Sequence, residues 1–269
     1  MEDLLTSCIC TQRQLESPIF QSWCEKIHER KNHMHRKIWE WCFIAQALYE
    51  RDMLSANRKG LGFAVGREPL VALFASFGCK LTATDQDEQS AQKKDANWIA
   101  SGEHAANVEV LNERGICDPA VFADNVIFQS VDMNAIPPEL RDFDFCWSSC
   151  AFEHLGSIQL GKQFIYNMLH CLKPGGIAVH TTEYNVTSNT TTMDYSSSVF
   201  FRRSDFEEMA KQLQSMGCII DIDFTLGNAP ADLFVDSPPY RHDPHLKFFF
   251  NGYVSTSIGL IIQKGGDKK

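Results

Sequence analysis

The stretch Gly60-Leu61-Gly62-Phe63-Ala64-Val65-Gly66 joins a short apolar run to a glycine-rich turn, and an apolar helix is expected after it, over 69–77. Glycines in such a turn let the backbone approach a ligand closely, and the helix that follows offers unpaired N–H groups at its first turn. Asp85 ends the next apolar run, about 20 residues later, the spacing at which a carboxylate meets ribose hydroxyls in dinucleotide folds. The stretch therefore predicts a strand–turn–helix unit that binds a nucleotide-like cofactor.

The same alternation of short apolar runs and amphipathic segments continues along the chain. Strands alternating with helices of about 10–15 residues indicate βαβ units and a largely parallel sheet. Two final strands without a helix between them suggest an antiparallel last strand. We expect strands over 60–65, 79–84, 126–131, 143–148, 177–182, 219–225 and 255–262, and helices over 69–77, 86–100, 161–172 and 205–216.

Two regions lie outside this alternation. Residues 1–57 are interpreted as an N-terminal arm and helical cap: 1–17 lack periodicity and read as a loose arm, and 18–54 carry apolar residues at the spacing of two helices. Residues 58–269 form the expected catalytic domain. Within it, 226–253 is a long insertion rich in Pro, Asp, His and aromatic residues, which predicts a lid over the acceptor site.

Composition limits the classes of function. The formal net charge of −9 argues against a broad nucleic-acid-binding face. The basic run 26–37 is either a local nucleic-acid-binding patch or, more simply, the solvated face of a helix. Trp39 and Trp41 are expected in the core. The ten cysteines show no metal-binding spacing and indicate a reducing compartment. No signal peptide and no membrane span are expected, so the predicted location is cytoplasmic.

Further polar residues follow the predicted strands where a cofactor would bind. Asp132 ends the third strand and is placed to accept a hydrogen bond from an adenine amino group, with Met133 against the ring. The expected cofactor-binding residues are Gly60, Gly62, Ala64, Gly66, Asp85, Gln86, Asp132, Met133, Ser148 and Ser149. For Asp85, a helix N-cap is the structural alternative, and the two roles are compatible.

Two further motifs carry a family resemblance. Glu153-His154-Leu155 follows the fourth predicted strand, and Leu172-Lys173-Pro174-Gly175-Gly176 precedes the fifth. Together with the glycine turn, Asp85 and Asp132, they resemble the class I S-adenosylmethionine-dependent methyltransferases over about residues 58–262. The resemblance implies a Rossmann-like α/β fold, with a seven-stranded mostly parallel sheet, helices on both faces and a reversed last strand. It implies S-adenosyl-L-methionine as the cofactor.

The chain departs from that family at the glycine turn. The family has an acid where this chain has Gly60, and a glycine where it has Ala64. The contact with the methionine amine is therefore left to backbone carbonyls near Gly60 or to a nearby carboxylate such as Glu68.

Candidate catalytic residues lie after the fourth and fifth predicted strands. A hydroxyl acceptor must lose a proton during methyl transfer, and His or a carboxylate is the usual base. His154 and His180 are the candidate bases, with Glu153 or Glu183 as the orienting group or as the base itself. For His154, capping or packing behind the strand is an equal alternative.

Polar residues near these positions predict a polar or anionic acceptor. Four segments resemble methyltransferases that act on sugars of bacterial surface glycans: Glu153–Gly156, His180–Asn185, Phe201–Arg203 and 238–245. The expected substrate-binding residues are Asn185, Arg202, Arg203, Tyr240, Arg241, His242, His245 and Lys247. The alternative is that these residues have no role in binding and belong to a solvated loop or, for the arginines, to the surface. A divalent metal held by Glu183 with His242 or His245 is left open, because no spacing rule supports it.

The sequence thus predicts a methyltransferase that acts on oxygen in a sugar or other polar small molecule, with a small-molecule or glycan acceptor as partner and no nucleic acid. Three alternatives remain: N- or O-methylation of a natural product, lipid or protein; a non-catalytic S-adenosylmethionine-binding protein; and an NAD-dependent oxidoreductase, which would leave the Lys173-Pro174-Gly175-Gly176 motif unexplained. The oligomeric state is not predicted.

Overall fold

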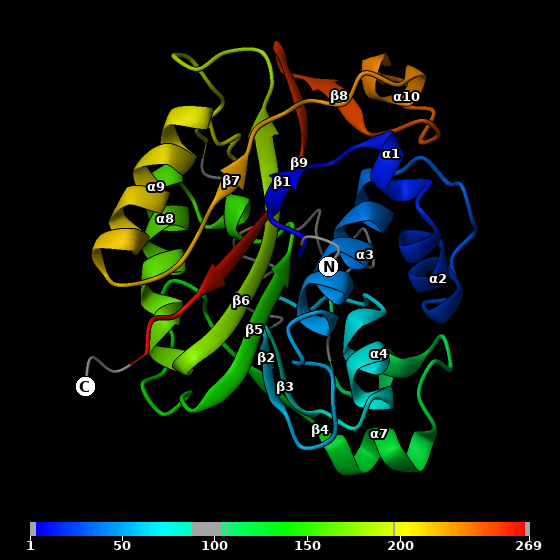
Figure 1. The fold of residues 1–269 in the computed structure, drawn as a ribbon, viewed down its shortest axis with the longest axis vertical. Coiled ribbons are helices and arrows are strands. Elements are labelled where there is room, and N and C mark those ends of the chain that lie inside the picture. The colour runs from blue at the N-terminus through cyan, green and yellow to red at the C-terminus, as the bar shows by residue number, and fades with distance from the viewer. Residues whose placement is uncertain (1–3, 88–103, 106, 196, 267–269) are drawn as a thin grey trace.

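The computed structural model describes residues 4–87, 104–105, 107–195 and 197–266. In this part of the chain, nine strands form one mixed sheet with helices on both faces (Figure 1). The strands are β1 (Ser7–Ile9), β2 (Lys59–Gly62), β3 (Lys80–Asp85), β4 (Val126–Ser130), β5 (Phe143–Ser149), β6 (Leu172–Asn185), β7 (Ile222–Asp223), β8 (Lys247–Phe250) and β9 (Tyr253–Gln263).

The sheet order is β4-β3-β2-β5-β6-β9-β1-β7, with β8 paired to β9. Strands β2 to β6 are parallel, and β9 runs antiparallel to β6 over the pairs Ile177↔Gln263 to Asn185↔Ser255. The mostly parallel sheet and the reversed last strand are confirmed, whereas the expected count of seven strands is too low. Strand β6 also starts five residues earlier than predicted, so the Lys-Pro-Gly-Gly motif lies within it.

One correction concerns the N-terminus. Residues 7–9 form β1, which pairs antiparallel with β9 and parallel with β7. Ser7 and Ile9 are each 1% exposed, and the Ser7 hydroxyl accepts a hydrogen bond from the Ile261 amide at 2.9 Å. The segment is therefore an interior strand of the sheet, between β9 and β7, and not a loose arm.

Helices of the first half cover one face of the sheet (Figure 1). They are α1 (Gln12–Leu15), α2 (Pro18–Lys26), α3 (Arg36–Tyr49), α4 (Leu70–Ser76) and α7 (Pro119–Asn125). Ser17 caps α2, with Pro18 at its first position, as expected for a helix start. The α3 helix lies on β9 where Gly259 leaves room for the ring of Phe43, since a Cβ there would come within 2.2 Å of it. Trp39 and Trp41 lie in this core, as expected.

The other face is covered by α8 (Ile158–Asn167) and α9 (Arg203–Ser215), with a second apolar core beneath them. Asp205 accepts a hydrogen bond from the Arg202 amide at 2.9 Å. Arg202 is therefore the N-cap of α9, two residues before the predicted cap at Ser204. The helix predicted over 86–100 lies mostly outside the described residues. The 226–253 insertion contains α10 (Pro230–Leu233) and β8.

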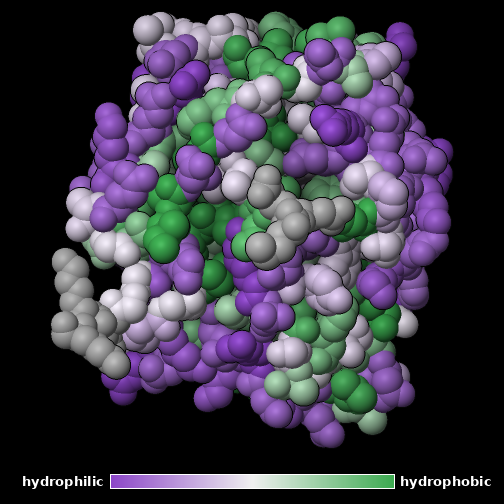
Figure 2. Space-filling model, in the orientation of Figure 1, coloured by the Kyte–Doolittle hydropathy of each residue, from purple (hydrophilic) through white to green (hydrophobic). Residues whose placement is uncertain are grey.

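The surface seen in Figure 2 is mainly hydrophilic, and its hydrophobic side chains gather in separate groups. In the part of the chain that the structure describes, none of the helices is long and apolar enough to cross a membrane. All ten cysteines are free thiols.

Candidate functional site

The strand order reverses between β2 and β5, and ligands in open α/β sheets bind beyond the carboxyl ends of the strands at such a point. Lys37, from the first turn of α3, reaches this point. Its Nζ lies 2.8 Å from Oε1 of Glu68 in the turn after β2, and 3.4 Å from both Oγ and the carbonyl oxygen of Ser149 at the end of β5. A partly buried cation and a partly buried carboxylate therefore face each other across the switch point.

A second group of charges surrounds Glu40, which is fully buried. Its carboxylate pairs with Arg36 at 3.1 Å and with Lys37 at 3.4 Å, and it accepts hydrogen bonds from the hydroxyls of Ser149 (3.2 Å) and Ser257. Burial alone would raise the pKa of Glu40, but the charges of Lys37 and Arg36 hold it below its usual value. Glu40 thus stays ionised and fixes both cations at the site.

Glu183, a predicted catalytic residue, belongs to this network. Its Oε1 lies 2.7 Å from Arg36 Nη1, and its Oε2 accepts a hydrogen bond from the Ser255 hydroxyl at 2.6 Å. Burial raises the pKa of Glu183, and the Arg36 charge offsets only part of that effect. Both carboxylate oxygens have partners, which favours a positioning role.

Glu153 is also fully buried but is less completely bound. Its Oε2 accepts a hydrogen bond from the Thr182 hydroxyl at 2.9 Å, whereas Oε1 has no hydrogen-bond partner among the described residues. Cys150, held with φ at 51°, places its sulfur in one group with the carboxylates of Glu153 and Glu183, within 4.8 Å of both. The structure therefore leaves one carboxylate oxygen unsatisfied beside the end of β5.

The two predicted histidines lie in different surroundings. His154 is exposed, and its Nδ1 lies 2.8 Å from the carbonyl oxygen of Ser197. His180 is fully buried between the rings of Phe152 and Phe164, and its Nδ1 lies 2.7 Å from the Ser148 hydroxyl. Burial lowers the pKa of His180 to about 3. The lowered pKa makes His180 a weak proton acceptor, and the Ser148 hydroxyl bonded to it is buried as well.

The glycine turn is packed more tightly than the sequence suggested. A Cβ on Gly60 would meet Phe145 at 2.4 Å, and one on Gly62 would meet Trp147 at 2.4 Å, so both glycines make room for aromatic rings of β5. Ala64 and Gly66 are in the left-handed region, with φ of 46° and 52°. The first two glycines therefore serve packing within the sheet, and the turn proper begins after them.

Asp85 ends β3 as predicted but has no exposed surface. Its carboxylate accepts hydrogen bonds from the amides of Gly66 (3.0 Å), Gln86 (2.8 Å) and Ala105 (3.3 Å). Despite these bonds, burial raises the pKa of Asp85 to about 6. In this arrangement Asp85 stabilises the loops and does not present its carboxylate to a ribose.

Asp132 and Met133 follow β4 as expected. Asp132 is exposed and accepts a hydrogen bond from the Asn134 amide at 2.9 Å, while Met133 is buried in the second core. Asp132 is thus accessible to a ligand, and the Met133 side chain is not.

The predicted substrate residues near α9 are bound within the chain. Asn185 hydrogen-bonds the Thr191 carbonyl and the Thr192 hydroxyl, at 3.1 and 2.9 Å. Arg202 pairs with Asp205, and Arg203 pairs with Glu207, each at 2.8 Å. An anionic acceptor must compete with these carboxylates for the two arginines.

The predicted lid residues come together near the amino end of α3. The Tyr240 hydroxyl donates to the Phe249 carbonyl at 2.9 Å, and Arg241 lies over the ring of Phe234. His242 and His245 group with His35 and not with Glu183, so the metal pairing left open in the sequence is replaced by another set. Lys247, at the start of β8, is partly buried, and its pKa is lowered by that burial.

Sequence reasoning missed the roles of Arg36, Lys37 and Glu40. The available signal was their spacing: three charged residues at i, i+1 and i+4 inside an otherwise apolar helix. Such charges share one helix face and need partners when that face is buried.

A surface hollow lies elsewhere, at the amino-terminal end of β6. Its lining includes Tyr166, His170 and Lys264. Because α/β folds bind ligands at the opposite ends of their strands, we place the candidate site at Lys37 and Glu68.

No protein-family model and no curated protein sequence matches the chain. Among solved structures, it is similar to a putative sarcosine dimethylglycine methyltransferase from Galdieria sulphuraria, with a TM-score of 0.51 and 15% identity over 93% of this chain and 99% of that one. TehB from Haemophilus influenzae gives a TM-score of 0.49 and 13% identity, over 84% and 67% of the two chains. A putative methyltransferase from Bacillus halodurans gives 0.48 and 14%, over 81% and 97%. The first of these likenesses shows a shared fold.

Proposed function

We propose that this chain is an S-adenosylmethionine-dependent methyltransferase that methylates oxygen in a sugar or another polar small molecule. The observation that carries the proposal is the Lys37–Glu68 pair at the point where the strand order reverses. The fold it shares with a structure described as a methyltransferase supports the same conclusion.

The charges at the switch point fit the methionine end of the cofactor. That end carries an α-carboxylate, which is opposite in charge to Lys37, and an α-ammonium group, which is opposite in charge to Glu68. Ser149 adds a carbonyl and a hydroxyl. Glu68 thereby takes the role of the acid that is absent at Gly60. The ribose end fits less well, because Asp85 is already bound by three backbone amides.

The bound cofactor would supply an electrophilic sulfonium methyl group, and the chain's own residues then have to place the acceptor and remove its proton. We assign the base to Glu153, because its Oε1 is a buried carboxylate oxygen without a hydrogen-bond partner in the described part of the chain. Thr182 orients this carboxylate through Oε2, and Cys150 lies beside it. Arg36 and Ser255 hold Glu183 next to it as a positioning residue.

His154 is the second candidate base, since it is exposed and its Nε2 lies 3.9 Å from Glu153 Oε1. Asn185, Arg202, Arg203 and the lid residues Tyr240, Arg241, His242, His245 and Lys247 remain proposed acceptor contacts. A lid over 226–253 is supported by its position beside the amino end of α3, where Arg36 N donates to the His245 carbonyl at 3.1 Å.

The test is calorimetry with S-adenosylhomocysteine and with NAD, followed by transfer of labelled methyl from S-adenosylmethionine into a fractionated cell extract. We expect binding of S-adenosylhomocysteine, no binding of NAD, and label in the nucleotide-sugar or glycan fraction. Label confined to lipid or protein would move the proposal to those acceptors, and binding without label in any fraction would favour a non-catalytic binder. Absence of binding would overturn the cofactor assignment.

A further inference from the structure

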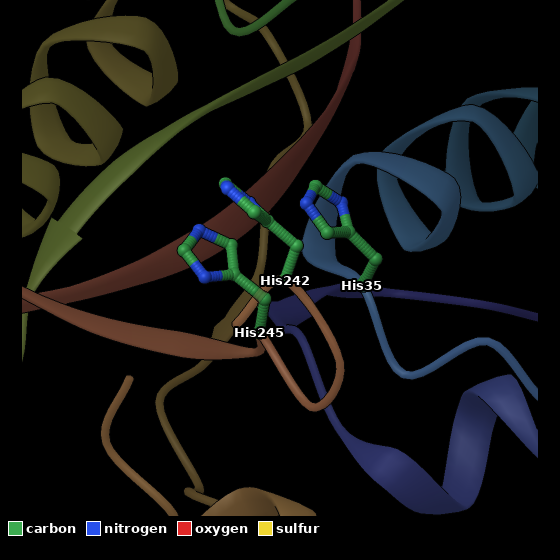
Figure 3. A group of neighbouring side chains, drawn as sticks. All are labelled: His35, His242 and His245. Carbon is green, nitrogen blue, oxygen red and sulfur yellow. The ribbon is translucent and has the colours of Figure 1, made fainter. Parts of the chain in front are cut away.

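Three histidines from two distant segments meet at the surface beside the amino end of α3 (Figure 3). His35 precedes α3, and His242 and His245 lie in the loop between α10 and β8. One ring nitrogen from each residue lies within 4.8 Å of those of the other two. Three imidazoles at this separation are the donor set that zinc and related divalent ions use.

The backbone holds two of these histidines side by side. The Arg36 amide donates to the His245 carbonyl at 3.1 Å, and the His245 amide donates to the Met34 carbonyl at 2.6 Å. The rings of His35 and His245 stack, with centroids 4.9 Å apart. This pairing is fixed by main-chain hydrogen bonds and does not depend on a bound ligand.

A buried carboxylate positions the other parts of the cluster. Asp236, 1% exposed, lies 2.7 Å from Nδ1 of His245 and accepts hydrogen bonds from the amides of Arg241 and His242. These amide bonds hold His242 in the left-handed region, with φ at 61°. A carboxylate that accepts a hydrogen bond from one ring N–H leaves the lone pair of the other ring nitrogen free, which is how metal-bound histidines are oriented.

His35 is the N-cap residue of α3. Nδ1 of His35 accepts a hydrogen bond from the Lys37 amide at 3.2 Å, so binding of an ion by this ring is linked to the first turn of α3.

We propose that His35, His242 and His245 bind one divalent transition-metal ion of the zinc class. In tetrahedral zinc sites the ligand nitrogens are about 3.3 Å apart, so the rings close by roughly an ångström, chiefly through the exposed His242. The ion would hold the 236–247 loop to the residues that precede Arg36 and Lys37. This inference does not rest on the proposed methyl transfer.

The probe is Zn²⁺ alone, added to the full chain after treatment with a chelator. We expect one ion per chain by calorimetry and a rise in melting temperature on its addition. His242→Ala should weaken Zn²⁺ binding at least tenfold and abolish the rise, because it removes an exposed ligand. His170→Ala, which removes an exposed histidine at the other end of the sheet, should behave as the wild type.

Two further measurements separate this site from others. Asp236→Asn should weaken binding by roughly ten- to hundredfold through His245, as loss of an outer-shell carboxylate does elsewhere. The Co²⁺ form should show visible d–d bands without a thiolate charge-transfer band. Absence of binding, equal binding by His242→Ala, or a thiolate band pointing to Cys150 would each overturn the proposal.

Discussion

The Nζ atom of Lys37 lies 2.8 Å from Oε1 of Glu68 and so connects the amino end of α3 to the turn after β2. Burial raises the pKa of Glu68, and the Lys37 charge offsets part of that rise. The pair lies where the sheet order reverses, so a zwitterionic ligand bound there would meet both charges in place of their contact with each other.

Glu68→Gln is therefore expected to weaken binding of S-adenosylhomocysteine by about 1.5–3 kcal/mol, since a hydrogen bond to a charged group is replaced by a neutral one. Calorimetry measures the change. Glu113→Gln is the matched control, because Glu113 is exposed and pairs with Arg67 of the same turn. Equal affinity in the two variants would contradict the placement of the methionine end.

Glu153→Gln should lower the rate of methyl transfer by roughly 10²–10⁴-fold, because the amide retains the bond to Thr182 but does not remove a proton. Affinity for S-adenosylhomocysteine should stay unchanged. Rates at saturating cofactor, compared with the exposed control Glu109→Gln, test this. A parallel loss of rate and cofactor affinity would show that Glu153 acts on the fold instead.

Glu40→Gln should lower the free energy of unfolding by about 1.5–3 kcal/mol, because a neutral amide replaces the charged acceptor of the bonds from Arg36, Lys37 and Ser149. Arg36 and Lys37 keep Glu183 and Glu68 as partners. Glu207→Gln removes an exposed partner of Arg203 and should cost less than about 1 kcal/mol. Urea unfolding compares the two. Similar losses in both variants would mean that the buried network contributes no more than a surface pair.

Gly259→Ala should destabilise the fold by about 1–3 kcal/mol, because its Cβ would overlap the buried ring of Phe43. Phe43→Leu should recover part of this loss when combined with it, a coupling that a double-mutant cycle measures. Gly266→Ala, with no neighbour within 4 Å of the added atom, is the control. Strict additivity would show that α3 does not pack on β9 at this point.

The raised pKa of the Asp85 carboxyl makes the stability of the fold depend on pH. Its folded pKa is about 6, above the value of about 3.9 for an unfolded chain, so the folded state binds more protons between these values. The contribution of this carboxyl to stability is therefore greatest below about pH 4 and falls as the pH rises to about 6. In Asp85→Asn this fall should be missing. Urea midpoints from pH 4 to 7 give the difference, and parallel curves for the two proteins would contradict the raised pKa.

Local sequence patterns determined most of the sheet and its flanking helices. The apolar runs after Gly60 and Phe143 and the amphipathic segment ending at Ser215 each formed the predicted type of element, because period and capping act over a few residues. The acidic end of β3 at Asp85 was also predicted. The sequence alone therefore determined the α/β class and the edge of the sheet at which to look for a site.

Only the tertiary structure decided what those residues contact. Strand β1 joins the sheet by pairing with β9, more than 200 residues away. The sequence of residues 7–9 contains no periodic pattern that predicts this strand. His180 proved to be buried, while Arg36, Lys37 and Glu40 of an apolar helix were brought to the strand ends. The cluster of His35, His242 and His245 likewise exists only through folding. The physical reason is that burial, pKa and donor geometry depend on contacts between distant segments, and a residue's type and local spacing do not specify those contacts.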